Sequence, residues 1–291
     1  MELLLRSMLF APANNPEYIE KALSSAADAV VFDLEDAVPA GGKREARALL
    51  KATLAAGRVS GRTAFIRTNA PDSPDMPSDL ATGMHPDIAG FVTPKVTSPD
   101  DLVFMDRMLG LIETEHGVKE VRYKLIPLIE NTSALMNAAA IAQGSPRVVA
   151  LCFGGYDYSS DLKLISDDRS LFHRLPRAMI AVAARSAGVQ PIDTPYFAVR
   201  DMDGLRAEKE EAAALGFAGS LVITPRHIDI VNECFSPSEK AVAYAGGVLA
   251  AIDEAERNGA SYALYDGLMV DAPIESLARH ISDYARRIAK Q

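Results

Sequence analysis

Charged residues follow several short apolar runs in this sequence, at the point where each run ends. They are Asp33, Glu35, Asp36, Arg67, Lys95, Glu130 and Asp157. If the runs are neighbouring strands of one barrel, their carboxyl ends meet at one rim and these side chains converge. Converging carboxylates with one Arg and one Lys repel one another unless a cation is present, and Mg²⁺ accepts carboxylate oxygens while keeping several waters. The pattern therefore predicts a divalent metal site.

Glu130 and Asp157 are the predicted metal ligands. Each follows an unbroken apolar run, and neither has an adjacent basic residue. The dipeptide Gly154-Gly155 before Asp157 lets the backbone approach a ligand closely. Asp157 also has an alternative role as the N-cap residue of a helix, where an Asp side chain contributes about 0.5–2 kcal/mol. The sequence leaves both roles of Asp157 open.

The other charged residues have predicted roles around this metal. Alternation along a strand puts Asp33 and Glu35 on the same side, facing the barrel interior, and leaves Asp36 to a loop. Arg67 offers a planar fork for a carboxylate or an enolate-like oxygen, or for a salt bridge to the neighbouring acidic strand. Lys95 could form a Schiff base in a metal-free aldolase. Beside a metal cluster, an electrostatic role or an ion pair is favoured for Lys95.

Eight runs of β-branched or apolar residues alternate with helical segments, as βα units around a parallel sheet do. The runs span residues 7–10, 29–34, 63–67, 88–92, 124–129, 148–153, 191–193 and 220–223. Eight strands with intervening helices in about 225 residues match a (β/α)8 or TIM barrel. A doubly wound nucleotide-binding sheet would need a glycine-rich turn after its first strand, and the turn from Ala11 to Asn15 has no glycine. The sequence predicts an α/β TIM barrel over residues 1–225.

Helical spacing of apolar residues predicts helices between the strands. They span residues 16–25, 43–56, 100–116, 133–143, 172–187 and 203–215. Residues 226–291 are predicted to form a C-terminal helix-hairpin-helix extension. Its helices, residues 237–257 and 273–290, flank Asp266-Gly267, a strong hairpin signal between apolar residues. Because a barrel needs no such hairpin, we expect the extension to pack on the outside of the barrel, on a neighbouring subunit or over the site.

Composition excludes several classes of protein. The 291 residues include 30 Lys and Arg against 39 Asp and Glu, a net charge of −9, and an acidic surface repels nucleic acid and anionic lipid. Two cysteines are too few for a disulfide framework, and no apolar run is long enough for a membrane span. The sequence motifs of zinc sites, serine hydrolases and P-loop NTPases do not occur. We expect a cytoplasmic protein without nucleic-acid or membrane partners.

Short motifs occur in a fixed order along nearly the whole chain. They are Arg6-Ser7-Met8-Leu9-Phe10, Asp33-Leu34-Glu35-Asp36-Ala37-Val38, Arg67-Thr68-Asn69, Pro94-Lys95, Ile126-Pro127-Leu128-Ile129-Glu130, Phe153-Gly154-Gly155-Tyr156-Asp157, Gly216-Phe217-Ala218-Gly219 and Asp266-Gly267-Leu268-Met269-Val270-Asp271. Together they resemble the citrate lyase beta-subunit-like family, alongside malyl-CoA and citramalyl-CoA lyases and the wider group of metal-dependent oxo-acid aldolases. The resemblance implies a Mg²⁺-dependent carbon–carbon lyase on a TIM barrel, assembled as a homotrimer or hexamer.

The resemblance also implies roles for individual residues. Glu130 and Asp157 would hold Mg²⁺, which chelates an oxo acid. Arg67 would stabilise the enolate or carbonyl oxygen while a 3-hydroxyacyl-CoA, such as citramalyl-, malyl- or citryl-CoA, is cleaved into an acyl-CoA and an oxo acid. Two further acidic residues, Glu35 and Asp36, would order the metal-bound waters.

A late aspartate completes the implied site. The resemblance implies that Asp271 comes from a neighbouring subunit as the acid or base for the thioester enolate, which gives the hairpin a function.

The sequence departs from the family pattern at Ser220 and Thr224, where Lys and His are common, and at Ala13, where Gly is common. These changes are expected near the rim where a thioester would enter. Two alternatives follow: a metal-dependent aldolase that uses free oxo acids without CoA, and a non-catalytic subunit of a lyase complex.

Overall fold

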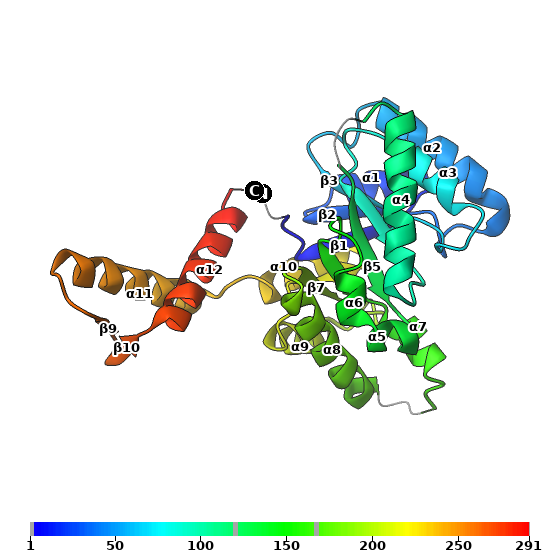
Figure 1. The fold of residues 1–291 in the computed structure, drawn as a ribbon. Helices are drawn as coiled ribbons and strands as arrows, with labels where there is room; N and C mark the ends of the chain where they lie inside the picture. Colours follow the sequence, from blue (N-terminus) through cyan, green and yellow to red (C-terminus); the bar gives the residue numbers. More distant parts are fainter. Residues whose placement is uncertain (1–2, 119–121, 166–168, 291) are drawn as a thin grey trace. The chain divides into compact units, whose positions relative to one another are not determined.

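The computed structural model describes residues 3–118, 122–165 and 169–290 of the chain (Figure 1). Internal contacts divide the chain into two compact units, Leu5–Phe235, and Ser236–Gln291 with Met1–Leu4. The first unit is the barrel and extends through Phe235. The second unit holds the C-terminal helices and hairpin.

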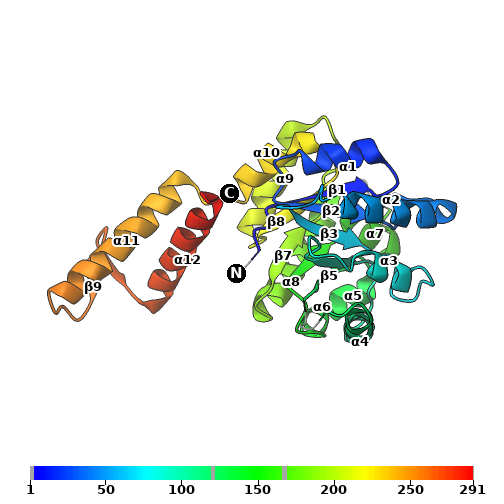
Figure 2. The same ribbon diagram turned by 90° about the horizontal axis from the view of Figure 1, so that it is seen from above.

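Eight parallel strands form a closed barrel in sequence order, and β8 pairs with β1 (Figures 1 and 2). The strands are β1 Ser7–Pro12, β2 Ala29–Asp33, β3 Thr63–Arg67, β4 Gly90–Thr93, β5 Lys124–Ile129, β6 Ala150–Phe153, β7 Gln190–Asp193 and β8 Gly219–Val222. Most strand residues are buried, because the barrel interior covers one face of each strand and helices cover the other. The eight predicted strands and the α/β TIM-barrel fold are confirmed.

Helices follow the strands along the chain and lie outside the barrel (Figure 2). They are α1 Pro16–Leu23, α2 Lys43–Ala55, α3 Met76–Thr82, α4 Pro99–Glu115, α5 Thr132–Met136, α6 Ala138–Ala142, α7 Gly155–Asp161, α8 Arg169–Ser186, α9 Met202–Ala214 and α10 Ile228–Cys234, with the 3-10 turns η1 Ala40–Gly42 and η2 Pro225–His227. Periodicity does not predict α3, α7 and α10, because seven residues hold too few repeats of a helical pattern. None of the helices in the described ranges has both the length and the apolar composition of a membrane span.

The prediction of one helix over residues 133–143 is wrong. Helix α5 ends at Met136 and α6 begins at Ala138, and Asn137 is the cap residue between them. The side-chain Nδ2 of Asn137 donates a hydrogen bond to the carbonyl of Thr97, 3.0 Å away, ahead of α4. This bond to another segment holds the break between the two short helices.

The second unit consists of α11 Glu239–Arg257, β9 Ala263–Tyr265, β10 Leu268–Val270 and α12 Ala272–Ile288. The predicted hairpin is confirmed, because β9 and β10 pair in antiparallel register and Asp266 and Gly267 between them have φ angles of 52° and 75°. Two central residues with positive φ are what a type I′ turn requires. A small core that includes Val248, Ala263 and Ala278 joins α11, the hairpin and α12.

A buried ion network ties two outer helices to β7. Nε of Arg177, on α8, lies 2.8 Å from one carboxylate oxygen of Asp193, and Nζ of Lys209, on α9, lies 2.7 Å from the other. Although burial opposes ionisation, the charges of Lys209 and Arg177 hold the pKa of Asp193 below its usual value. Nζ of Lys209 also donates to the carbonyl of Thr194 at 2.6 Å. The network therefore positions the chain as it leaves β7.

Replacement of Asp193 by Asn should destabilise the barrel strongly. It leaves Glu208 as the remaining counter-charge that the two buried cations share, and removing one partner of a buried ion pair costs about 3–5 kcal/mol. Because the folded pKa of Asp193 lies below its unfolded value, the stabilisation that its charge provides is complete above the unfolded pKa of about 3.9 and is lost as the pH falls through the folded pKa.

Urea unfolding at pH 7 measures the loss in the free energy of unfolding. Glu210→Gln, an exposed site on α9, is the control and should change stability by less than about 0.5 kcal/mol. Similar stability of the two variants would contradict the network.

Candidate active site

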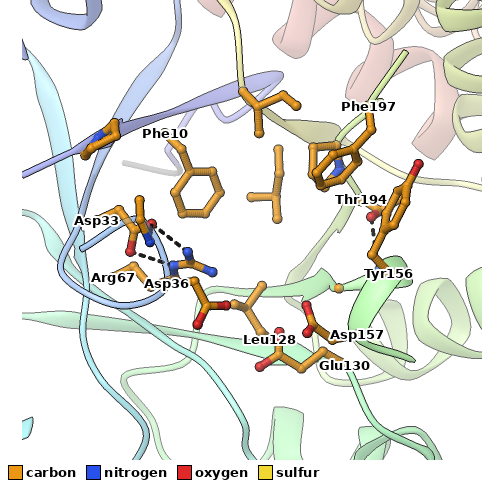
Figure 3. A pocket seen from close by; sticks show the side chains of 17 residues that line it. Phe10, Asp33, Asp36, Arg67, Leu128, Glu130, Tyr156, Asp157, Thr194 and Phe197 are labelled. Atoms are coloured by element: carbon orange, nitrogen blue, oxygen red, sulfur yellow. Dashed lines mark hydrogen bonds and ion pairs between the residues drawn. The ribbon is translucent and has the colours of Figure 1, made fainter. Parts of the chain in front are cut away.

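A cavity of about 450 Å³ lies at the carboxyl ends of the barrel strands (Figure 3). Seven of the eight strands contribute to its walls, through residues at or just beyond the strand end. This is where a TIM barrel places its active site, and the volume suits a small ligand. Five of the seven charged residues predicted from the sequence line this cavity: Asp33, Asp36, Arg67, Glu130 and Asp157.

Arg67 is fixed at the end of β3 by the acidic end of β2. Asp33 and Arg67 are partners in the strand register, and the guanidinium donates to both carboxylate oxygens of Asp33, from Nε at 2.8 Å and from Nη2 at 2.6 Å. Its Cζ lies 4.9 Å from the ring centroid of Phe10. Although burial opposes the charge, Asp33 holds the pKa of Arg67 above its ordinary value. The salt bridge to the acidic strand, one of two predicted roles, is therefore present, and Arg67 enters the cavity wall in a fixed orientation.

Glu35 lies between two cations beyond the end of β2. Its Oε2 is 3.0 Å from Nη1 of Arg67, and its Oε1 is 2.6 Å from Nζ of Lys95. Burial raises the pKa of Glu35, and the charges of Arg67 and Lys95 oppose that rise. The exposed carboxylate of Asp36 lines the cavity 3.6 Å from the same Nζ. Because β2 ends at Asp33, the direction of Glu35 is determined by these ion pairs and not by strand alternation.

Lys95 contacts two carboxylates, one through its side chain and one through its backbone. Its ammonium pairs with Glu35, and its backbone N–H donates to Oε1 of Glu130 at 2.5 Å. Its φ of 55° is left-handed, which is uncommon for a residue with a side chain. Although burial opposes the charge, the hydrogen bond to Glu35 raises the pKa of Lys95. A Schiff base requires a neutral amine, so the structure favours the ion-pair role of Lys95.

Glu130 follows β5, and only 5% of its surface is exposed. Burial, with the negative charges of Glu35 and Asp157, raises the pKa of Glu130 to about 8. The side chain packs against Gly154, where an added Cβ would lie 2.4 Å from Cβ of Glu130 and 2.9 Å from its Oε2. A residue without a side chain is therefore needed after β6 for Glu130 to occupy this position.

Asp157 lies in the first turn of α7, and its charge acts on Glu130 in the same cavity (Figure 3). The N-cap residue of α7 is Gly154, so the alternative role of Asp157 as an N-cap is wrong. The side chain of Asp157 is exposed. Its carboxylate can therefore contact a ligand that enters the cavity.

The charges around the rim fit a hard divalent cation. Five carboxylates, of Asp33, Glu35, Asp36, Glu130 and Asp157, face two cations, Arg67 and Lys95. In the described part of the chain, no group of three or more His, Cys, Asp or Glu is placed to hold a metal ion. Mg²⁺ does not require such a group, because it binds through one or two carboxylates and completes its shell with waters and substrate oxygens. The carboxylates of Glu130 and Asp157 therefore fit Mg²⁺.

Apolar side chains also line the cavity, and the charge pattern of the sequence does not reveal them. They include Phe10, Leu128, Leu221 and Ile223, and also the aromatic rings of Tyr156 and Phe197, whose centroids lie 4.0 Å apart. Residues two apart on a strand face the same side, so the position of Glu130 implies that Leu128 faces the cavity. By the same rule Leu221 and Ile223 face one side of the chain. Which side that is follows only from the exact position of β8, which the sequence does not give.

Neither Ser220 nor Asp271, two other residues singled out from the sequence, is among the residues that line the cavity. Ser220 is fully buried, and its hydroxyl donates to the carbonyl of Thr194 at 2.9 Å, so its expected place near the entrance is wrong. Its neighbour Leu221 lines the cavity instead, because successive strand residues face opposite sides. Asp271 lies in the second compact unit, where its Oδ1 accepts a hydrogen bond from the N–H of Ile274 at 3.1 Å and caps α12.

The closed barrel and the acidic cavity at its carboxyl end define a TIM-barrel enzyme. Residues 6–225 match the family HpcH/HpaI aldolase/citrate lyase, and the chain belongs to this family. It is 32% identical over 286 residues to the citrate lyase subunit beta of Leuconostoc mesenteroides, covering 98% of this chain and 94% of the relative. The family resemblance and the prediction of an enzyme of the carbon–carbon lyase type are confirmed.

Two further relatives show the range of activities among similar proteins. A (3S)-malyl-CoA thioesterase of Cereibacter sphaeroides is 34% identical over 266 residues, covering 91% of this chain and 89% of the relative. A solved structure of the protein CitE from Mycobacterium tuberculosis, in complex with magnesium, acetoacetate and coenzyme A, superposes with a TM-score of 0.74 at 29% identity. That match covers 96% of this chain and 97% of CitE.

Two replacements of Lys95 test whether its left-handed backbone is fixed. Lys95→Gly and Lys95→Val both remove the ammonium, but only valine is disfavoured at a φ of 55°. The free energy of unfolding of Lys95→Val should therefore be lower than that of Lys95→Gly by about 1–2 kcal/mol. Urea unfolding of the two variants measures this difference. Equal stabilities would mean that the backbone relaxes and that the N–H bond to Glu130 does not constrain it.

Proposed function

We propose that this chain is a Mg²⁺-dependent carbon–carbon lyase that cleaves or forms a 3-hydroxyacyl-CoA, such as citramalyl-, malyl- or citryl-CoA, with an acyl-CoA and an oxo acid as the fragments. One observation carries the proposal: the buried carboxylate of Glu130, with its raised pKa, shares a cavity with Asp157 and Arg67. The citrate lyase subunit to which the chain is similar, and the complex of CitE with magnesium, acetoacetate and coenzyme A, support it.

Glu130 and Asp157 are the proposed ligands of Mg²⁺. The bound ion would act as a Lewis acid toward the oxygens of the oxo acid. The N–H of Lys95 holds one oxygen of Glu130, which fixes the direction of the carboxylate. Glu35 and Asp36 are placed in this proposal to order the water molecules around the ion.

Arg67 is proposed to stabilise the developing oxygen anion. Cleavage of the carbon–carbon bond leaves negative charge on the acyl fragment and a carbonyl on the other fragment. A guanidinium has five N–H donors, and the contacts with Asp33 and Glu35 use three of them. The remaining donors can bind the enolate oxygen, and because Asp33 already fixes the guanidinium, little reorganisation is needed.

We further propose a homotrimer or hexamer in which Asp271 of a neighbouring copy moves the proton to or from the thioester carbon. Asp271 directly follows the β9–β10 hairpin. That hairpin exposes Leu264, Leu268 and Met269, each more than half accessible. An interface would remove these apolar side chains from water, which supports an assembly on this side of the unit.

Turnover assays test the proposed reaction. Purified protein with Mg²⁺ should convert at least one of citramalyl-, malyl- or citryl-CoA to acetyl-CoA and an oxo acid, and chelation of the metal should abolish the reaction. Glu130→Gln keeps the shape of the side chain but removes the charge, and we expect kcat/KM to fall at least about 100-fold. Glu210→Gln is the control that should keep full activity.

The products separate this proposal from its alternatives. Release of free CoA and a hydroxy acid would indicate thioester hydrolysis, the activity named for the malyl-CoA relative. Turnover of free oxo acids alone would indicate an aldolase that does not use CoA. No turnover of any of these compounds, with wild-type behaviour of Glu130→Ala in a host complex, would indicate a non-catalytic subunit.

Co-expression of two variants tests whether Asp271 reaches the site from a neighbouring subunit. Asp271→Ala and Arg67→Ala should each be nearly inactive, whereas co-expression of the two chains should restore part of the activity, because some sites then combine an intact Arg67 with an intact Asp271. Activity of the co-expressed, purified assembly measures the restoration. Full activity of Asp271→Ala alone, or no restoration on mixing, would contradict the shared site.

A further inference from the structure

The cavity has a charged part and an apolar part. Figure 3 draws the rings of Phe10 and Phe197 above Glu130 and Asp157, the proposed metal ligands. Leu221 and Ile223 of the β8 end add aliphatic surface to the same walls. A ligand chelated at the charged part would therefore direct the rest of its atoms into apolar surroundings.

The cavity offers little positive charge to a second carboxylate. Among the described residues that line it, Arg67 is the one cation, and the other ionisable side chains include Asp33, Asp36, Glu130 and Asp157. Arg67 already donates to both oxygens of Asp33. The ammonium of Lys95, outside the lining, is paired with Glu35 at 2.6 Å. A second carboxylate on a bound acid would meet mainly like charges.

The uncharged polar groups of the wall are partly engaged as well. The hydroxyl of Thr194 accepts a hydrogen bond from the N–H of Gly155 at 3.1 Å, and the carbonyl of Thr194 is bound by Lys209 and Ser220. These contacts hold the end of β7 in place. They do not supply the fork of donors that a carboxylate needs for tight binding.

We infer that the oxo acid handled by this site is a monocarboxylic 2-oxo acid with an apolar side chain, and not a dicarboxylic one. The inference rests on the proposed function, because it assumes that the acid chelates Mg²⁺ through its carboxylate and oxo group. If the proposed lyase function holds, the site should bind alkyl oxo acids, such as pyruvate and 2-oxobutyrate, more tightly than oxaloacetate. Discrimination comes from the apolar wall, which gains contacts with an alkyl group, and from the acidic rim, which repels a second anion.

Binding of matched pairs of acids in the presence of Mg²⁺ tests the inference. 2-Oxobutyrate and oxaloacetate have the same number of carbons and differ by a methyl group in place of a carboxylate, as do 2-oxopentanoate and 2-oxoglutarate. Isothermal titration calorimetry on the full-length protein should give at least tenfold tighter binding of the alkyl acid in each pair. Equal or tighter binding of the dicarboxylic acids would overturn the inference and leave the proposed lyase standing. No Mg²⁺-dependent binding of any 2-oxo acid would instead overturn the proposed function.

A charge placed in the apolar wall should reverse the preference. Ile223→Lys puts an ammonium at a half-buried lining position, and the ratio of affinities should shift at least tenfold toward oxaloacetate. Ile223→Met is the matched control and should keep the wild-type ratio, because it preserves an apolar side chain of similar volume. An unchanged ratio in a folded Ile223→Lys variant would contradict the role of the wall. If that variant does not fold, the comparison of acids on the wild-type protein decides.

Discussion

The site depends on a carboxylate that is buried among other negative charges. Glu130 is almost removed from solvent, yet Asp157 and Glu35 act on it as like charges. Such a group is costly to ionise unless a cation compensates. The surrounding chain keeps Glu130 in this position by local means: a left-handed Lys95 donates its N–H, and Gly154 leaves room for the side chain. These contacts constrain the position and direction of the carboxylate.

The barrel supplies the rest of the geometry. Parallel pairing of β2 with β3 puts Asp33 beside Arg67, so the guanidinium is held by a partner that the strand register provides. On the other side of the barrel, the buried network of Asp193, Arg177 and Lys209 supports the end of β7. Ser220 and Lys209 both bind the carbonyl of Thr194. Rigid strand ends therefore hold the acidic and apolar walls at fixed positions, as a preorganised site requires.

Much of this could be predicted from the sequence, because the relevant signals are local. The apolar run before Glu130 indicates a strand, and closure of the barrel brings its end to the same rim as Arg67 and Asp157. The hairpin at Asp266-Gly267 follows from the φ angles that these two residue types tolerate. The break at Asn137 has no such signal, since its cause is a hydrogen bond to Thr97 in another segment.

The remaining parts of the site depend on exact strand ends and on backbone angles. A shift of one residue in β8 exchanges Ser220 with Leu221 between the two faces of the strand, so the apolar wall could not be assigned from the sequence. The left-handed φ of Lys95 is unusual for its residue type and has no sequence signal. Asp271 lies in the second unit of the chain. Its position therefore cannot be predicted from the pattern of charges at the strand ends of the barrel.

Diffraction from a crystal grown with Mn²⁺ in place of Mg²⁺ tests the central claim most directly. Anomalous scattering locates Mn²⁺ without assumptions about the ligands. The account predicts one peak in the cavity, within about 2.0–2.3 Å of oxygens from both Glu130 and Asp157. A peak bound by neither carboxylate, or a cavity without a peak at saturating Mn²⁺, would contradict it.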